Sequence, residues 1–196
     1  MIFTLALILA SYLLGSVSAA VVVCRVLGKE DPRSSGSGNP GATNVLRLHG
    51  KGPALATLLG DIGKGVVPVL LARWLELGPL AVGSCACAAF LGHLFPVFFG
   101  FRGGKGVATF VGVLLAMSSV LGLCFVGIWL LVAALSRYSS LAALCATAAM
   151  PVVGLLLASP APYIAAMTVM GGAIFYRHSA NISRLLAGTE GRIGKR

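Results

Sequence analysis

The 196-residue chain has very little charge, and acidic residues are the scarcest of its charged groups. Asp, Glu, Lys and Arg make up 10% of the sequence, with five acidic against fifteen basic side chains, whereas hydrophobic residues make up 58% and the mean hydropathy is +0.96. A soluble domain of this length needs far more polar residues to cover its surface. The shortage of charge therefore excludes an ordinary soluble protein. It predicts an all-α polytopic membrane protein that forms one domain over residues 1–196.

Several familiar kinds of site are missing as well. The five cysteines lie in apolar segments, and Cys85 and Cys87 have no histidine or acidic residue beside them, so we expect neither a disulfide nor a metal site. The net charge of +10 is not arranged as a basic stripe with interleaved aromatic residues, so we expect no nucleic-acid partner. In a membrane protein such a charge indicates topology and contact with anionic lipid. Gly104-Lys105 lacks the upstream glycine and the following Ser or Thr of a P-loop, which disfavours an ATPase.

Seven apolar segments are candidates for membrane spans, which need about 20 residues each. They cover residues 2–24, 53–75, 80–99, 107–119, 121–136, 140–158 and 161–176. The first has no basic residues before it, so we interpret it as a span rather than a cleaved signal peptide. The fourth and fifth are short and nearly contiguous. Residues 107–136 therefore form either one long span or a hairpin of two, tilted or broken near Gly112 and Gly122.

The distribution of Lys and Arg decides between one span and two. Basic residues cluster after the first, third and last apolar segments. The last cluster consists of Arg177, Arg184, Arg192, Lys195 and Arg196. Under the positive-inside rule all three clusters are cytoplasmic, which is consistent only if residues 107–136 form two spans. We therefore predict about seven transmembrane helices, with the N-terminus outside and the C-terminus in the cytoplasm.

Three polar segments fall on the cytoplasmic side of this topology, at residues 33–47, 100–106 and 177–184. The first two are rich in glycine, and glycine-rich loops expose backbone N–H groups that can converge on an anion. A helix that starts near Thr43, capped by Asn39 or Thr43, would add its dipole. Any one of these segments is typical of an ordinary turn with basic anchors, whereas three on one face predict a site for a phosphorylated ligand. The alternative is a transport or binding protein for a phosphorylated solute, whose polar groups we would expect nearer the middle of the membrane.

Two ionisable residues, Asp61 and Lys64, lie inside the second apolar segment. Charged groups within a span are costly and are usually paired, and a spacing of three places these two on one helix face. We favour a structural ion pair. In the alternative interpretation, Lys64 reaches toward the phosphate site.

Six short stretches, taken in order, resemble the bacterial acyl-phosphate:glycerol-3-phosphate acyltransferase family. They are 36–47 (GSGNPGATNVLR), 61–65 (DIGKG), 92–96 (GHLFP), 99–109 (FGFRGGKGVAT), 137–141 (RYSSL) and 176–185 (YRHSANISRL). The resemblance covers nearly the whole chain. It implies a multi-pass enzyme of the bacterial inner membrane that faces the cytoplasm and transfers an acyl group from acyl phosphate to the sn-1 hydroxyl of glycerol 3-phosphate. The product is lysophosphatidic acid, at the start of phospholipid synthesis.

The same resemblance implies which residues form the site. It assigns essential roles to Ser37, Arg47, Lys105, His178 and Asn181. It places near the substrates Gly36, Gly38, Asn39, Asn44, Arg102, Gly103, Gly104, Gly106 and Ser139. As supporting residues we add Asp61, Lys64, His93 and Arg177. It implies no metal and no other cofactor, and a candidate partner is the enzyme that forms the acyl phosphate.

The sequence also limits the mechanism. None of the three histidines is followed five residues later by an aspartate, so the His–Asp pair of other glycerol-phosphate acyltransferases is absent. The proton of the attacking hydroxyl must then go to His178 or to a substrate phosphate, and the resemblance favours the phosphate. A covalent acyl-enzyme on Ser37 is the weaker alternative, because no His or Asp lies near Ser37 in the sequence to activate it.

Overall fold

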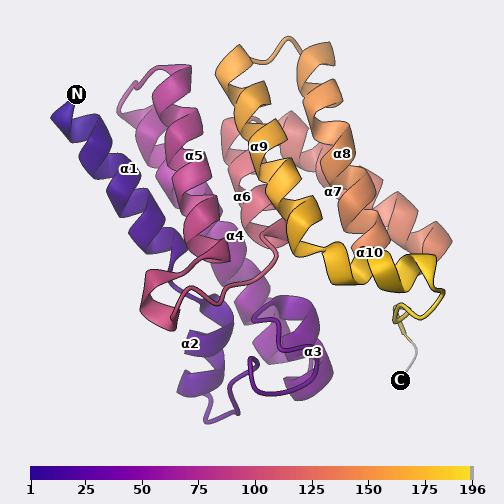
Figure 1. Cartoon of the computed structure of the whole chain (residues 1–196). Coiled ribbons are helices and arrows are strands. Elements are labelled where there is room, and N and C mark those ends of the chain that lie inside the picture. The colour runs from indigo at the N-terminus through magenta and orange to yellow at the C-terminus, as the bar shows by residue number, and fades with distance from the viewer. Residues whose placement is uncertain (195–196) are drawn as a thin grey trace.

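The computed structural model describes residues 1–194, and every element in that range is helical (Figure 1). Lys195 and Arg196 of the predicted C-terminal basic cluster lie outside the described residues. The elements in chain order are α1 (Ile2–Gly15), α2 (Ala19–Val26), α3 (Ala42–His49), α4 (Lys51–Trp74), α5 (Pro79–Leu94), the 3-10 turn η1 (Val97–Phe99), α6 (Val107–Met117), α7 (Ser119–Ser136), α8 (Ser139–Leu156), α9 (Ala161–Arg177) and α10 (Ser179–Leu186). Long apolar runs take this form because a helix satisfies its own backbone hydrogen bonds in lipid.

Four helical stretches are both long and apolar enough to cross a membrane: α4, α5 together with η1, α7 and α8. A fifth is obtained if the bent pair α1 and α2 counts as one span. The predicted all-α membrane architecture is therefore confirmed. Helix α6 has only 11 residues, and at about 1.5 Å per residue it covers roughly half of a bilayer core. The count of seven spans and the sides of the two termini stay predictions.

The first apolar segment is not one straight helix. It breaks at residues 16–18, and α1 and α2 meet at 48°. A break in a membrane helix frees backbone carbonyl groups that need other partners. Lys64 of α4 supplies one, because its Nζ donates to the carbonyl oxygen of Val17 at 2.8 Å.

Residues 107–136 form two helices, as predicted, but the break lies elsewhere. It falls at Ser118, between α6 and α7, whereas Gly112 and Gly122 lie inside the helices. These glycines allow close packing instead of bending. A Cβ atom on Gly112 would overlap the backbone of Ile62 in α4, and one on Gly122 would overlap Leu115 of α6. The expected break at the glycines is wrong because tight contact, not chain reversal, requires them.

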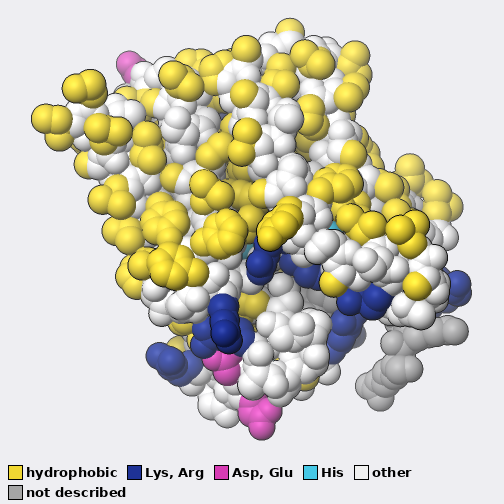
Figure 2. Space-filling model, in the orientation of Figure 1, with side chains coloured by type: hydrophobic (Ala, Val, Ile, Leu, Met, Phe, Trp, Pro, Cys, Tyr) yellow, Lys and Arg dark blue, Asp and Glu magenta, His cyan; other side chains and the backbone are white. Residues whose placement is uncertain are grey.

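The core lies between three closely packed pairs of helices, α4 with α6, α1 with α5, and α7 with α8. At its centre Phe110 contacts Phe90 and Phe125 edge to face, with ring centroids 6.4 and 5.7 Å apart. The outer surface of these helices is largely apolar, whereas Lys and Arg side chains gather near α2, α3 and the junction of α9 with α10 (Figures 1 and 2). The molecule thus has one polar, basic end, which contains all three polar segments of the sequence.

Candidate active site

The first polar segment is a loop that precedes α3, and Asn44 holds it together. The Asn44 side chain is 1% exposed. Its Nδ2 donates to the carbonyl oxygens of Pro32 and Ser35 at 2.8 and 3.2 Å, and its Oδ1 accepts from the backbone N–H of Ser37 at 3.0 Å. Both N–H bonds of the Asn44 side-chain amide are therefore used within the protein. Asn44, expected near the substrate, organises the loop.

The start of α3 differs from the expectation. Gly41 is the N-cap residue, and no side chain caps the helix, so the predicted cap by Asn39 or Thr43 is wrong. The backbone of the preceding loop turns at Gly36, where φ is +63° and a Cβ atom would overlap Oδ1 of Asn44. Only glycine satisfies both conditions. The loop thus reaches α3 by packing on Asn44 rather than by capping.

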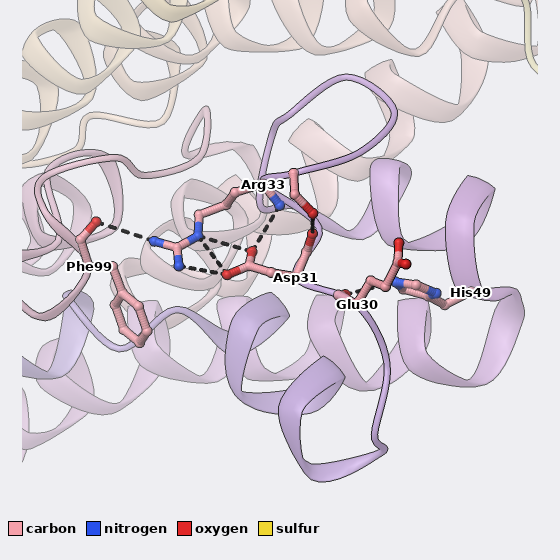
Figure 3. A network of polar contacts seen from close by, with 6 residues as sticks. Glu30, Asp31, Arg33, His49 and Phe99 are labelled. Carbon is pink, nitrogen blue, oxygen red and sulfur yellow. Dashed lines mark hydrogen bonds and ion pairs between the residues drawn. The ribbon is translucent and has the colours of Figure 1, made fainter.

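Arg33 of this loop pairs with Asp31 and contacts Phe99, which directly precedes the second polar segment (Figure 3). Arg33 donates from Nε and Nη2 to the carboxylate of Asp31 at 2.6–3.1 Å, and the hydrogen bonds from Arg33 lower the pKa of Asp31. The same guanidinium lies 5.5 Å from the ring centroid of Phe99 and donates to the Phe99 carbonyl at 3.3 Å. Figure 3 also shows His49 of α3 beside Glu30, with His49 Nε2 3.1 Å from the backbone carbonyl oxygen of Glu30.

The second polar segment, residues 100–106, is held between the ends of α5 and α9. The N–H of Gly104 donates to the carbonyl of His93 in the last turn of α5 at 3.2 Å. From the other side, Arg177 donates to the carbonyls of Gly103 and Gly104 at 2.7 and 3.2 Å. Arg177 therefore supports the site by fixing the path of the glycine-rich loop.

Lys105 connects this loop to the third polar segment. Helix α9 ends at Arg177, His178 interrupts it, and α10 begins at Ser179. The change of direction visible in Figure 1 brings the buried Asn181 side chain to Lys105, whose Nζ donates to Asn181 Oδ1. Two residues that lie 76 positions apart in the sequence, both expected in the site, thus form its centre.

Glu190 completes this centre, although it was not among the site residues predicted from the sequence. Its carboxylate accepts hydrogen bonds from Asn181 Nδ2 at 2.6 Å, from Ser140 Oγ at 2.7 Å and from Arg184 Nε at 2.7 Å. Burial alone would raise the pKa of Glu190, but these hydrogen bonds hold it below its ordinary value. The residue expected from α8 was Ser139, whereas its neighbour Ser140 makes the contact. The available signal was that no other acidic residue follows Glu76 in the sequence.

The electrostatics of the centre suit an anion. Burial lowers the pKa of Lys105, and although Glu190 raises it, the neighbouring charges of Arg184, Arg47 and Arg177 lower it further. Such crowding of cations costs free energy that a bound anion relieves. The basic end of the molecule is therefore arranged to take up negative charge.

His178 is buried and neutral. Burial lowers its pKa to about 4, and the charges of Lys105 and Arg177 act in the same direction. Its Nδ1 lies 2.8 Å from the carbonyl oxygen of Ile174. A carbonyl can only accept, so Nδ1 carries the proton and Nε2 presents a free lone pair. His178 is thus set up to accept a hydrogen bond near Lys105.

Three other expected site residues share none of the hydrogen bonds of this centre within residues 1–194. Ser37, Arg47 and Arg102 are exposed. Arg47 still belongs to the same surroundings, because its charge acts on Lys105. The hydroxyl of Ser37 makes no hydrogen bond within residues 1–194, and nothing in that range joins it to Lys105 or Asn181.

Asp61 and Lys64 form the expected ion pair, with Asp61 Oδ1 2.9 Å from Lys64 Nζ. The ammonium group also donates to Val17, so it is directed toward the break between α1 and α2. These two contacts favour the structural ion pair, and the alternative in which Lys64 reaches the phosphate site stays a prediction. The imidazole of His93 lies on the other side, with Nδ1 3.4 Å from Asp61 Oδ1.

An apolar groove opens beside the polar centre. It has a volume of about 340 Å³ and lies between α8, α9 and α10, where Leu141, Leu144, Phe175, Ile182 and Leu185 line it. Ile182 and Leu141 directly follow the polar residues Asn181 and Ser140 in the sequence. Helix α10 therefore presents polar groups to the centre and apolar groups to the groove, as an interfacial helix does.

Known proteins match this chain along almost its whole length. A family model described as glycerol-3-phosphate acyltransferase matches residues 5–188. The chain belongs to this family. The glycerol-3-phosphate acyltransferase of Thioalkalivibrio sulfidiphilus is 56% identical over all of this chain and 97% of the relative, and that of Hydrogenovibrio crunogenus is 52% identical over 97% and 92%.

Solved structures agree with the family assignment. A crystal structure of PlsY (YgiH), an integral membrane glycerol 3-phosphate acyltransferase in its glycerol 3-phosphate form, has a TM-score of 0.93 and 40% identity, and covers 97% of this chain and 96% of that one. A lysophosphatidic acid form of the same protein has a TM-score of 0.92 and 39% identity, over 97% of this chain and 95% of that one. The resemblance noted in the sequence is confirmed, and the chain is an integral membrane member of the family.

Proposed function

We propose that this protein transfers an acyl group from acyl phosphate to the sn-1 hydroxyl of glycerol 3-phosphate, which yields lysophosphatidic acid and phosphate. The observation that carries the proposal is the meeting of Lys105 and Asn181 among several cations at the basic end of a membrane protein. Glycerol 3-phosphate and lysophosphatidic acid name the two forms of the related crystal structures, which supports them as substrate and product.

The cations and the loop amides bind and align two phosphorylated substrates. In the reaction, the sn-1 oxygen forms a bond to the acyl carbon, and the bond between that carbon and the phosphate oxygen breaks. The phosphate leaves with the electron pair. Alignment can contribute about 7–11 kcal/mol, and each donor aimed at the developing oxyanion roughly 3–4 kcal/mol. Lys105, Arg47 and the backbone N–H groups of Gly103, Lys105 and Gly106 are the donors that we assign to these roles, since the N–H of Gly104 already donates to the carbonyl of His93.

A substrate phosphate accepts the proton of the attacking hydroxyl. A phosphate monoester has a second pKa of about 6, whereas the pKa of His178 is about 4. At neutral pH the phosphate is therefore the stronger base. His178 instead orients the hydroxyl, since its unprotonated Nε2 can accept a hydrogen bond.

The acyl chain lies in the apolar groove between α8, α9 and α10, because two residues that line it, Ile182 and Leu141, directly follow Asn181 and Ser140 in the sequence. An acyl phosphate held there keeps its tail among lipid-facing side chains and its head among cations. We place this site on the cytoplasmic face of the bacterial inner membrane, since the basic residues gather at that end of the molecule.

Purified protein given palmitoyl phosphate and glycerol 3-phosphate tests the proposal. We expect phosphate release that requires both substrates, and none from palmitoyl-CoA. Binding of glycerol 3-phosphate without turnover would favour a binding or transport protein instead.

The absence of an acyl-enzyme needs its own test. Ser37→Ala and Ser37→Cys variants are incubated with palmitoyl phosphate alone and analysed by mass spectrometry of the intact protein, beside the wild-type protein. We expect no added acyl mass in any of them, because Ser37 is exposed and its hydroxyl has no hydrogen-bonded base within the described residues. An acyl adduct on residue 37 would contradict the substrate-assisted mechanism.

A further inference from the structure

Three ionisable side chains lie buried among the helices beneath the glycine-rich loop. Asp61 and Lys64 of α4 are 2% and 6% exposed, and His93 of α5 is 6% exposed. A buried ion pair is rarely retained for stability alone, because desolvating the charges costs about as much as their attraction returns. Nothing in the reaction proposed above uses them. Their positions therefore call for another explanation.

Lys64 and His93 contact Asp61 from two sides. Lys64 Nζ lies 2.9 Å from Asp61 Oδ1 and donates a hydrogen bond to the carbonyl of Val17 at the break between α1 and α2. This hydrogen bond explains why a lysine is present at position 64. His93 Nδ1 lies 3.4 Å from the same oxygen. At 3.4 Å this is an electrostatic contact rather than a hydrogen bond, and because a carboxylate only accepts, it favours the imidazole tautomer with the proton on Nδ1, the edge of the ring that faces it.

The opposite edge of the His93 ring supports the loop. A Cβ atom on Gly104 would overlap His93 Nε2, and one on Gly103 would overlap the His93 carbonyl oxygen. The N–H of Gly104 also donates to that carbonyl. The loop therefore rests directly on His93, and rotation of the imidazole would displace it.

The displacement would reach the next residue, Lys105, whose Nζ must meet Asn181. Arg177 holds the loop carbonyls from the far side, so His93 and Arg177 clamp the loop between them. Of these two residues, His93 is the one that contacts the buried carboxylate of Asp61.

We propose that Asp61 is a positioning residue that acts through His93: it fixes the imidazole on which Gly103 and Gly104 pack, and so sets the place of Lys105. This inference rests on the proposed function in one respect, namely that Lys105 binds a substrate phosphate. Residues that orient a binding group from behind typically change affinity by roughly tenfold or more when replaced.

The test compares Asp61→Asn, His93→Gln and the double variant with Thr57→Val. Thr57 lies one turn before Asp61 on α4, is buried, and its hydroxyl has no partner among residues 1–194, so it controls for loss of a buried polar group. We expect the KM for one phosphorylated substrate to rise about tenfold in each single variant, with kcat lowered less than threefold. The double variant should be no worse than His93→Gln, because Asp61 acts through His93. Thr57→Val should leave both KM values unchanged.

Hydrogen exchange of the backbone amides of residues 103–106 gives a readout that does not depend on turnover. We expect it to become faster by about tenfold in the Asp61 and His93 variants, and to stay unchanged in Thr57→Val. Unchanged exchange and KM values, with only a lower yield of folded protein, would reduce the pair to a structural one and overturn the proposal. Additive effects in the double variant would also overturn it. Wild-type protein without acyl transfer would instead contradict the proposed function and leave the exchange test valid.

Discussion

The two glycine-rich loops have similar compositions, but different parts of the molecule hold them in place. In the loop before α3, the hydrogen bonds of Asn44 and the ion pair of Asp31 with Arg33 join residues no more than 12 positions apart. In the loop at 100–106, two of the partners, Arg177 and Asn181, are more than 70 positions away. The first loop is thus held mainly by contacts within its own sequence, with one longer contact from Arg33 to Phe99, and the second by the packing of α5, α9 and α10.

This difference indicates that the two loops depend to different extents on the assembly of the helices. A locally ordered loop keeps its shape when distant helices shift, whereas a loop clamped by distant helices is correct only when the whole bundle is assembled. Lys105 lies on the second kind of loop, so its cation is placed only in the folded membrane protein. The first loop brings Arg47 of α3 near it from a largely independent unit.

The largest expected effect is at the centre of the clamped loop. Lys105→Met should lower kcat/KM by about 100-fold or more, because it removes a charged donor to phosphate. Lys105→Arg keeps the charge but not the geometry, so its kcat/KM should lie between those of the wild-type protein and Lys105→Met. The matched change in the first loop is Lys29→Met, an exposed cation that should leave activity within twofold. Rates with palmitoyl phosphate and glycerol 3-phosphate check this, and a Lys105→Met enzyme with a tenth of wild-type activity would contradict the role.

The organiser of the local loop comes second. Asn44→Ala leaves two carbonyls and the Ser37 N–H without their partners and should cost about 2–3 kcal/mol of unfolding free energy. Asn44→Asp retains the acceptor for Ser37 but places a buried carboxylate oxygen against the carbonyls of Pro32 and Ser35, so it should cost at least as much as Asn44→Ala. Hydrogen exchange should accelerate over residues 32–37 and stay unchanged over 103–106. If both loops loosened together, the first loop would not be an independent unit.

Glu190 offers a smaller change within the clamped region. Its carboxylate raises the pKa of Lys105, so Glu190→Gln should lower that pKa. Because Lys105 must be protonated to attract phosphate, activity should then be lost at a lower pH on the alkaline side, with a several-fold decrease at most near neutrality. Glu76→Gln, at the end of α4, is the control and should leave the pH–rate profile in place. If the alkaline limb of the pH–rate profile did not move in Glu190→Gln, Glu190 would not control the pKa of Lys105.

The same comparison explains what could be predicted from the sequence. The apolar segments gave all the long helices, since hydropathy is a local property, and the family motifs brought Lys105 and Asn181 to attention before any contact was known. The bend after α1, the break at Ser118 and the role of Glu190 were missed. Each depends on partners in other helices, such as Lys64 for Val17 and Ser140 for Glu190, and no short sequence window contains both members of such a pair.

The smallest expected effect concerns the direct link between the two loops. Arg33 and Asp31 are partly exposed, and such pairs contribute about 0–1 kcal/mol, so Arg33→Met should lower the unfolding free energy by no more than about 1 kcal/mol. Arg33 lowers the pKa of Asp31, so this contribution is present above the ordinary pKa of aspartate and is lost as pH falls through the lowered pKa of the folded protein. Thermal unfolding of the two proteins in detergent should therefore differ slightly at pH 7, and the difference should shrink as the pH is lowered below about 4. A large difference at pH 7, accompanied by faster exchange in both loops, would mean that the contact of Arg33 with Phe99 couples them and that the local loop is not self-supporting.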